Sequence, residues 1–267
     1  MNRIDRCFAQ LQQRGEKALV CFLTGGDPDL ETTQELVPAI AQAGADIIEI
    51  GVPFSDPLAD GPSIQASTHR ALAAGASVKK VFDCVRRIRE NSDAPLVLMT
   101  YYNPVQKYGV EAFARDAADS GADGVILTDL PPEEAHDWKT AADDAGLATI
   151  FLLAPTSTED RIELGAKLAS GFIYCVSRTG VTGAKDDVPL ELSGLVGMIK
   201  SRSNLPVVVG FGISKAEHVS QVCRFADGAV VGSALVNVIA DHTSRTDAVK
   251  QAVRFVQSLK EGVAVRE

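Results

Sequence analysis

The chain has 267 residues, of which 46% are hydrophobic, and its 26 lysines and arginines against 35 aspartates and glutamates give a formal charge of −9. This length is enough for one sizeable core, and about 250 residues are typical of an eight-stranded α/β barrel. The acidic balance argues against nucleic acid or a membrane surface as a partner, because both attract clustered lysine and arginine.

Eight short apolar runs, rich in β-branched residues, recur along the chain between helical patterns. They are expected to be strands at Ala18–Thr24, Asp46–Ile50, Leu96–Tyr101, Gly124–Leu127, Ala148–Leu153, Phe172–Val176, Val207–Val209 and Ala229–Val231. Most of these runs are continuously hydrophobic rather than alternating, which is typical of parallel strands that helices cover.

The segments between these strands carry apolar residues at helical spacing. One such face comprises Val78, Val81, Phe82, Val85 and Ile88. Ser214 and Glu217 form a capping-box pattern, which predicts that Ser214 caps a later helix. Additional helices are expected at Arg3–Gln13, between the second and third strands, and at the C-terminus.

A weak internal repeat supports a regular succession of strand and helix. Residues 43–46, 120–123 and 225–228 each combine a small residue with an aspartate where a helix should give way to a strand. Eight such units fit either a closed barrel or a doubly wound sheet, and the lack of a GxGxxG motif after the first strand weakens the second. We therefore predict an α/β fold, a (β/α)8 TIM barrel with additional helices, as a single domain over residues 1–267.

The five cysteines are odd in number and lie mostly inside apolar runs, at Cys7, Cys21, Cys84, Cys175 and Cys223. They are expected to be reduced core residues, and no CxxC pair or Cys/His cluster suggests a metal site. The N-terminal residues form no apolar signal core, and no run reaches about 18 apolar residues. The protein is therefore expected to be soluble and cytoplasmic.

The active site of an α/β barrel lies at the C-terminal ends of its strands, and Glu49 is the most unusual residue there. A carboxylate within the apolar run 47–50 is costly unless it is paired, protonated or used. Glu49 is thus either a salt-bridged residue at the barrel edge or a general acid/base whose surroundings raise its pKa. The proline-rich loop 51–62 that follows carries Asp56 and Asp60, which an ordinary turn would also explain.

Glycines follow the last two predicted strands, in the segments 210–214 and 232–234. Glycine lets the backbone approach a ligand, and free N–H groups at helix starts bind anions. Because these loops are the recurrent phosphate site of TIM barrels, we predict a phosphate site there, with ordinary turns as the alternative. The small, polar loop 177–184 fits either a mobile lid or an ordinary loop.

The sequence lacks the catalytic residues that the two known classes of aldolase require. Apart from Lys185, which lies in a loop, the lysines fall on predicted helices, helix ends or strand starts, so a Schiff-base mechanism lacks its strand lysine. The four histidines lie on or near predicted helices and are expected at the surface, so a metal-dependent aldolase lacks ligands.

Six stretches of the chain together resemble the tryptophan synthase α-subunit family. They are the segments Phe22–Pro28, Glu49–Pro62, Tyr101–Pro104, Ser177–Gly183, Gly210–Ser214 and Gly232–Ala234. The likeness spans nearly the whole chain, and the 49–62 stretch is highly specific, although Gly25 differs from many members and Tyr102 replaces a smaller residue of some. The resemblance implies a lyase of tryptophan biosynthesis that cleaves indole-3-glycerol phosphate into indole and glyceraldehyde 3-phosphate.

Carried over residue by residue, the resemblance implies that Glu49 and Asp60 are the catalytic carboxylates and that Tyr174 assists them. The residues that would hold the phosphate are Gly183, Gly212, Gly232 and Ser233. The residues that would wall the indole are Phe22, Met99, Tyr101, Ile126, Leu152 and Phe211. The lid residues would be Arg178 and Thr182, and the residues facing a partner would be Pro53, Phe54, Asp56 and Asp129.

The resemblance also implies that the chain itself needs neither a cofactor nor a metal. Its partner would be the tryptophan synthase β subunit, which carries pyridoxal phosphate and receives indole directly in an allosteric α2β2 heterotetramer. The alternatives are a stand-alone indole-3-glycerol-phosphate lyase, another phosphate-binding barrel enzyme such as an isomerase, and a non-catalytic allosteric partner. The presence of both Glu49 and Asp60 argues against the last of these.

Overall fold

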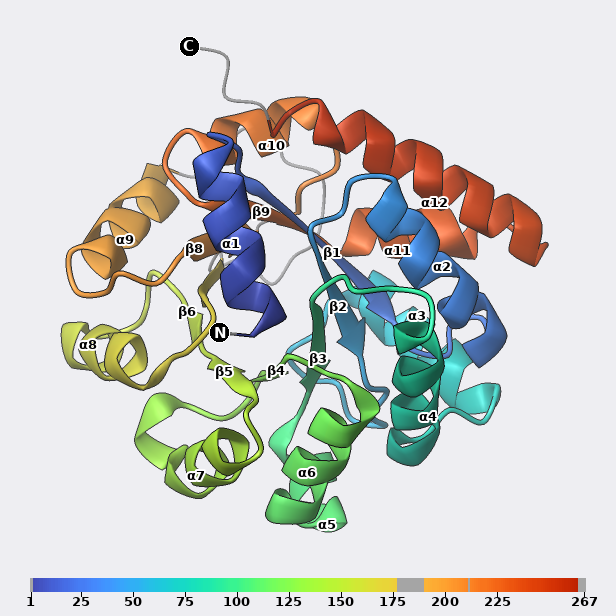
Figure 1. Cartoon of the computed structure of the whole chain (residues 1–267), viewed down its shortest axis with the longest axis horizontal. Helices are drawn as coiled ribbons and strands as arrows, with labels where there is room; N and C mark the ends of the chain where they lie inside the picture. The colour runs from blue at the N-terminus through green and yellow to red at the C-terminus, as the bar shows by residue number, and fades with distance from the viewer. Residues whose placement is uncertain (1, 177–189, 211, 264–267) are drawn as a thin grey trace.

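The computed structural model describes residues 2–176, 190–210 and 212–263, and a ring of parallel strands lies at its centre (Figure 1). The strands are β1 (Ala18–Thr24), β2 (Ile47–Gly51), β3 (Leu96–Thr100), β4 (Gly124–Leu127), β5 (Ala148–Ile150), β6 (Leu152–Leu153), β7 (Ile173–Val176), β8 (Val207–Gly210) and β9 (Gly228–Val231). They are hydrogen-bonded in the order β5-β4-β3-β2-β1-β9-β8-β7-β6.

This strand order belongs to a barrel rather than to a doubly wound sheet. It follows the chain around the ring without the reversal at which a doubly wound sheet changes direction. The two ends of the order, β5 and β6, are one run of chain interrupted at Phe151, whose carbonyl accepts the N–H of Tyr174 at 3.1 Å. The predicted fifth strand is therefore divided in two and closes the ring, and the predicted barrel is confirmed.

Helices surround the ring and connect successive strands (Figure 1). They are α1 (Arg3–Gln13), α2 (Leu30–Gln42), α3 (Pro62–Ala73), α4 (Val78–Arg89), α5 (Tyr102–Tyr108), α6 (Val110–Ser120), the 3₁₀ helix η1 (Pro132–Glu134), α7 (His136–Asp144), α8 (Glu159–Leu168), α9 (Leu190–Lys200), α10 (Ala216–Cys223), α11 (Ser233–Ala240) and α12 (Arg245–Lys260). The additional helices appear where they were predicted. In the described part of the chain, none is long and apolar enough to cross a membrane.

The start of α10 differs from the prediction. Its N-cap is Lys215, and no side chain caps the helix, so the expected role of Ser214 is wrong. The N–H of Ser214 instead donates to Nδ1 of His218 at 3.4 Å. His218 is only 3% exposed because it lies on the buried face of α10, so the expectation that this histidine is at the surface is also wrong.

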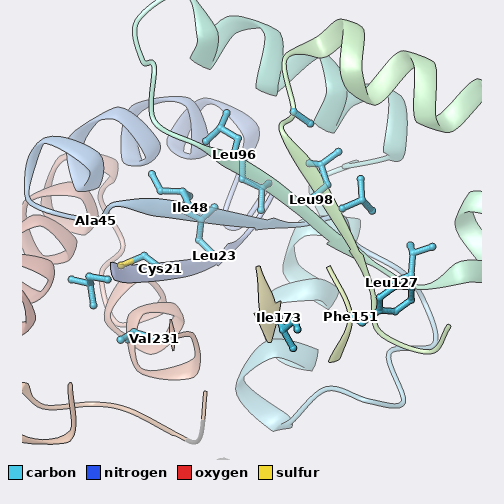
Figure 2. Close-up of a cluster of buried hydrophobic side chains, with 14 of the residues drawn as sticks. Cys21, Leu23, Ala45, Ile48, Leu96, Leu98, Leu127, Phe151, Ile173 and Val231 are labelled. Carbon is cyan, nitrogen blue, oxygen red and sulfur yellow. The ribbon is translucent and has the colours of Figure 1, made fainter. Parts of the chain in front are cut away.

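Alternate residues of each strand face two separate cores. The outer faces pack against the helices, and the residues labelled in Figure 2 include Cys21, Leu23, Ile48, Leu96 and Leu98. The inner faces fill the barrel, with Val20, Ile47, Val97, Ile126 and Val208 among them. Helix α1 packs its apolar face against the first residues of the strands, so the barrel is covered at the end where the strands begin.

The repeated junction sequence has a structural role at this covered end. Asp46, Asp123 and Asp227 each precede a strand, accept an N–H from the neighbouring strand, and pair with a lysine or arginine. Asp123 is the most enclosed, since its Oδ2 accepts the N–H of Leu96 at 2.9 Å and lies 2.5 Å from the Arg89 guanidinium. These contacts tie strands to helices at one end and leave the opposite end for binding.

Candidate active site

A cavity of about 590 Å³ opens where the strands end. Side chains from β3, β4, β6, β7 and β9 contribute to its wall, together with the loops that follow β2 and β4. The predicted site residues that line it are Asp60, Met99, Asp129, Leu152, Tyr174, Gly212, Gly232 and Ser233. The predicted residues thus come from seven separate segments and meet at one mouth of the barrel.

Glu49 is a fully buried carboxyl on β2. It is 0% exposed, and neither of its oxygens has a hydrogen-bond partner among the residues that the structure describes. Two residues earlier on the same strand, Ile47 faces the barrel interior, so the period of a strand turns Glu49 inward as well. Burial raises the pKa of Glu49 to about 8, and the salt-bridge alternative has no partner within the described ranges.

Glu49 contributes no surface to the large cavity. Its register partners are Phe22 on β1 and Val97 on β3. Tyr174 does line the cavity, and its pKa is raised well above its usual value, first by burial and then by the charge of Glu49. The charge of Glu49 thus acts on a residue of the cavity wall, although Glu49 itself lies behind that wall in this structure.

Asp60 lies in the loop after β2 and belongs directly to the cavity wall. Burial raises its pKa to about 6, and the hydroxyl of Tyr101 opposes that rise. This hydroxyl also accepts the N–H of Ala59 at 2.9 Å, and the Tyr101 ring lies 5.5 Å from the ring of Phe54. Tyr101 therefore holds both ends of the segment 54–60 that carries Asp60.

The glycines after β8 and β9 line the same cavity. Gly212 has a φ of +92°, a conformation that favours glycine, so a side chain there would strain the turn. Gly232 is the N-cap of α11, and no side chain caps this helix, which leaves its first N–H groups available to an anion. The other predicted phosphate residue, Gly183, lies outside the described residues, as do Arg178, Thr182 and Phe211.

The predicted indole residues occupy three different places. Met99 and Leu152 line the large cavity, whereas Ile126 is fully buried in the barrel core. Phe22 and Tyr101 line a second cavity of only about 20 Å³, which also touches Asp60. Among the predicted indole residues that the structure describes, Met99 on β3 and Leu152 on β6 are therefore the two that line the large cavity.

Sequence reasoning missed several lining residues, including Ile64, Thr128, Val176 and Val230, whereas Gly210 belongs to the segment predicted to bind phosphate. Thr128 and Val176 follow inward-facing residues by two positions, so strand periodicity was the signal that could have found them. Gly210 has a different role. A Cβ atom on it would lie 2.6 Å from the Tyr174 hydroxyl, so glycine makes room for that ring.

The residues predicted to face a partner differ in their exposure. Pro53 is buried and Phe54 is half-buried, whereas Asp56 is exposed. Leu58, which sequence reasoning overlooked, is 91% exposed in the same loop. Asp129 lines the large cavity, and its carboxylate accepts the N–H of Tyr102 at 2.7 Å.

The cysteines are free, and all but the half-buried Cys7 are buried. Within the described ranges, no group of three or more histidine, cysteine, aspartate or glutamate side chains could hold a metal ion.

Comparison with known proteins places this site in a family. The family model described as tryptophan synthase alpha chain matches residues 8–264. A tryptophan synthase alpha chain from Geobacter sulfurreducens is 51% identical over 263 residues, covering 98% of this chain and 99% of the relative. One from Geotalea daltonii is 52% identical over 264 residues, covering 99% and 100%.

Solved structures agree with these sequence matches. Tryptophan synthase subunit alpha from Legionella pneumophila superposes with a TM-score of 0.91 at 38% identity, covering 98% of both chains. A chain of Mycobacterium tuberculosis tryptophan synthase gives the same score, identity and coverage. The resemblance inferred from the sequence is confirmed, and the chain belongs to the tryptophan synthase alpha chain family, the lyase subunit of tryptophan synthase.

Proposed function

We propose that the chain cleaves indole-3-glycerol phosphate into indole and glyceraldehyde 3-phosphate with Glu49 and Asp60 as its catalytic carboxylates. One observation carries this assignment. A buried carboxyl without a partner among the described residues stands behind a cavity whose wall holds a second carboxyl and two glycine-rich loops. A general acid, a charge stabiliser and an anion site thus occur at one mouth of the barrel.

The substrate would lie with its phosphate at the glycine-rich end of the cavity. Gly212, Gly232 and Ser233 would bind the phosphate through backbone N–H groups, supported by the positive end of the α11 dipole. The indole ring would lie against Met99 and Leu152. Gly183 would add a further N–H group, and Arg178 and Thr182 would close over the ligand.

The reaction is a retro-aldol cleavage, which needs an acceptor for the electron pair of the broken C–C bond. Protonation of indole C3 supplies one, because the resulting indolenine cation draws that pair back into the ring. The pKa of Asp60, about 6, keeps this carboxyl ionised at neutral pH, so it can stabilise the positive charge at N1. The positive charge that develops on the ring is thus matched by a fixed negative one.

Glu49 would carry the proton in both directions. Burial raises its pKa to about 8, so it is protonated at neutral pH and can donate to C3. Its carboxylate then accepts the proton of the glycerol hydroxyl as that carbon becomes the aldehyde and the C–C bond breaks. One proton enters and one leaves, and Glu49 ends in the state in which it began.

Tyr174 would assist as a hydrogen-bond donor. Because burial and the nearby charge of Glu49 raise the pKa of Tyr174, its hydroxyl stays protonated throughout the reaction. A neutral donor beside Glu49 would stabilise the carboxylate that forms after proton transfer.

The partner would be the tryptophan synthase β subunit in an α2β2 heterotetramer. Asp56 and Leu58 are exposed on the loop that also carries Asp60, and this loop would form part of the contact together with Pro53, Phe54 and Asp129. Contact through Phe54 would reach Asp60 by way of Tyr101 and raise activity. The chain itself would use no cofactor, with pyridoxal phosphate in the β subunit, and the complex would be cytoplasmic.

The decisive experiment mixes the purified chain with indole-3-glycerol phosphate and measures indole. Wild type is expected to form indole and Glu49→Gln to lose turnover, because glutamine cannot transfer the proton. A Glu49→Gln variant with a tenth or more of the wild-type kcat would remove Glu49 from the mechanism. Adding the β subunit is expected to increase kcat, and an unchanged rate would favour a stand-alone lyase.

A further inference from the structure

The small cavity beside Asp60 has the size of a single water molecule. Its volume is about 20 Å³, and a buried water needs roughly 10–15 Å³ and two to four polar partners. The polar residues around it are Thr24, Asp60, Thr68, Thr100, Tyr101 and Thr128. Apolar side chains, among them Phe22, Phe54 and Met99, complete the lining, so a water molecule would find its polar partners on one part of the wall.

One hydroxyl in this lining has no hydrogen-bond partner among the described residues. Thr24, Thr100 and Thr128 each bond to a neighbouring hydroxyl or carbonyl. Thr68 lines the cavity and is 4% exposed, but its hydroxyl makes no such bond within the described ranges. Because a hydroxyl on the wall of a small cavity gains stability from a hydrogen bond, a ligand with both donor and acceptor groups would be stabilised there.

Asp60 offers the second polar partner. A carboxylate has about four lone-pair positions, and Tyr101 is the side chain that hydrogen-bonds to this one in the described part of the chain. Asp60 lies two residues before α3, ahead of the N-cap Gly61, and the Gln65 side-chain amide donates to the backbone carbonyl of Asp60 at 2.8 Å. Thr68 lies on α3, so this bond ties Asp60 to the helix that carries Thr68.

The helix that carries Thr68 is itself anchored to the loop after β1. The hydroxyl groups of Ser67 and Thr24 lie 2.6 Å apart in the buried interior. Arg70 donates to both oxygens of the buried Asp27, at 2.7 and 2.8 Å. Such bidentate pairs restrict orientation as well as distance, so the wall of the small cavity is rigid.

We propose that this cavity binds one water molecule that bridges the hydroxyl of Thr68 and the carboxylate of Asp60. The proposal deepens the function proposed above and rests on the role given there to Asp60. The water accepts the Thr68 proton and donates one of its own to the ionised carboxylate. Thr68 is then a positioning residue, which acts through the water to orient Asp60 and to keep it charged toward the indole nitrogen.

Loss of the water would change the ionisation of Asp60 in a definite direction. Among the described residues, the titratable and charged groups that share a cavity wall with Asp60 are Tyr101, directly after β3, and Asp129, Arg161 and Tyr174 on the large cavity. Tyr101 would remain as a donor, but the second donor would be gone. Removal of a hydrogen bond to the charged form raises the pKa of a carboxyl, by about one unit for a bond of ordinary strength.

The test uses Thr68→Val, which removes the hydroxyl and keeps the volume, and Thr68→Ser, which restores the hydroxyl. Thr149→Val is the matched control, because Thr149 is also buried, its hydroxyl also lacks a partner in the described residues, and it lines neither cavity at Asp60. A crystal structure of wild type is expected to show a water within hydrogen-bond distance of Thr68 Oγ1 and Asp60, and Thr68→Val to lack it. A dry cavity in wild type would overturn the proposal whether or not the variants fold.

The second readout is the pH dependence of kcat/KM for indole formation. The acid limb is expected to move up by about one pH unit in Thr68→Val, which lowers kcat/KM about tenfold on the acid side. It should return in Thr68→Ser and stay in place in Thr149→Val. An unmoved limb in Thr68→Val would overturn the positioning role, whereas absence of indole formation by wild type would reject the proposed function and leave the crystallographic result to decide the water site.

Discussion

Replacement of Glu49 by glutamine is expected to stabilise the fold while it removes proton transfer. The pKa of this buried carboxyl rises from 4.5 to about 8 on folding because burial disfavours the charged form. Between these two values the folded protein keeps a proton that the unfolded chain releases. Stability therefore falls as pH rises through this window, and below pH 4.5 the effect vanishes.

The magnitude follows from the shift. Each pH unit above 4.5 costs the folded state about 1.4 kcal/mol, so the penalty is about 1 kcal/mol at pH 5.5 and about 3 kcal/mol at pH 7. Glutamine has the shape of protonated glutamate and never ionises, so the variant should recover these amounts. The gain would be an example of an active site that is maintained at the expense of stability.

The assay is urea unfolding followed by far-UV circular dichroism, with wild type and Glu49→Gln measured at pH 5.5 and pH 7. Glu163→Gln is the control, because Glu163 is exposed on α8 and should change stability little at either pH. Other titrating groups are common to both proteins and cancel in the difference. If Glu49→Gln differs from wild type by the same amount at both pH values, the buried carboxyl is not protonated by its surroundings and the reasoning is wrong.

Three further outcomes are expected. Asp60→Asn should lower kcat/KM about a hundredfold, since one charged stabiliser of the transition state is lost; an unchanged value in steady-state kinetics would exclude Asp60. Gly210→Ala should destabilise the fold by about 1–3 kcal/mol and raise KM, because its Cβ would lie 2.6 Å from the Tyr174 hydroxyl. Addition of Tyr174→Phe removes that clash, so steady-state kinetics should show KM partly restored while kcat stays reduced by loss of the assisting hydroxyl. Asp123→Asn should lower the free energy of unfolding by about 3 kcal/mol, because it leaves Arg89 partly buried without its charge partner; equal urea midpoints for this variant and wild type would contradict that role.

Much of the barrel could be predicted from local patterns. A buried parallel strand needs a short apolar run, and a surface helix needs apolar residues three or four apart, so both signals lie within a few residues. The prediction was wrong where distant contacts decided the geometry. The run 148–153 divides at Phe151, where the ring closes, and α10 has Lys215 rather than Ser214 as its N-cap, with the Ser214 N–H bonded to His218.

The sequence by itself determined that Glu49 lies within an apolar strand. It also determined that Asp60 and the glycines of segments 210–214 and 232–234 follow the ends of strands. Only the tertiary structure decided that Glu49 has no partner among the described residues, that its carboxyl lies behind the cavity wall, and that Thr68 and Asp60 share a small cavity. The physical reason is that backbone preference depends on near neighbours, whereas the desolvation that sets a pKa comes from strands far away in the chain. Those strands meet only when the ring closes.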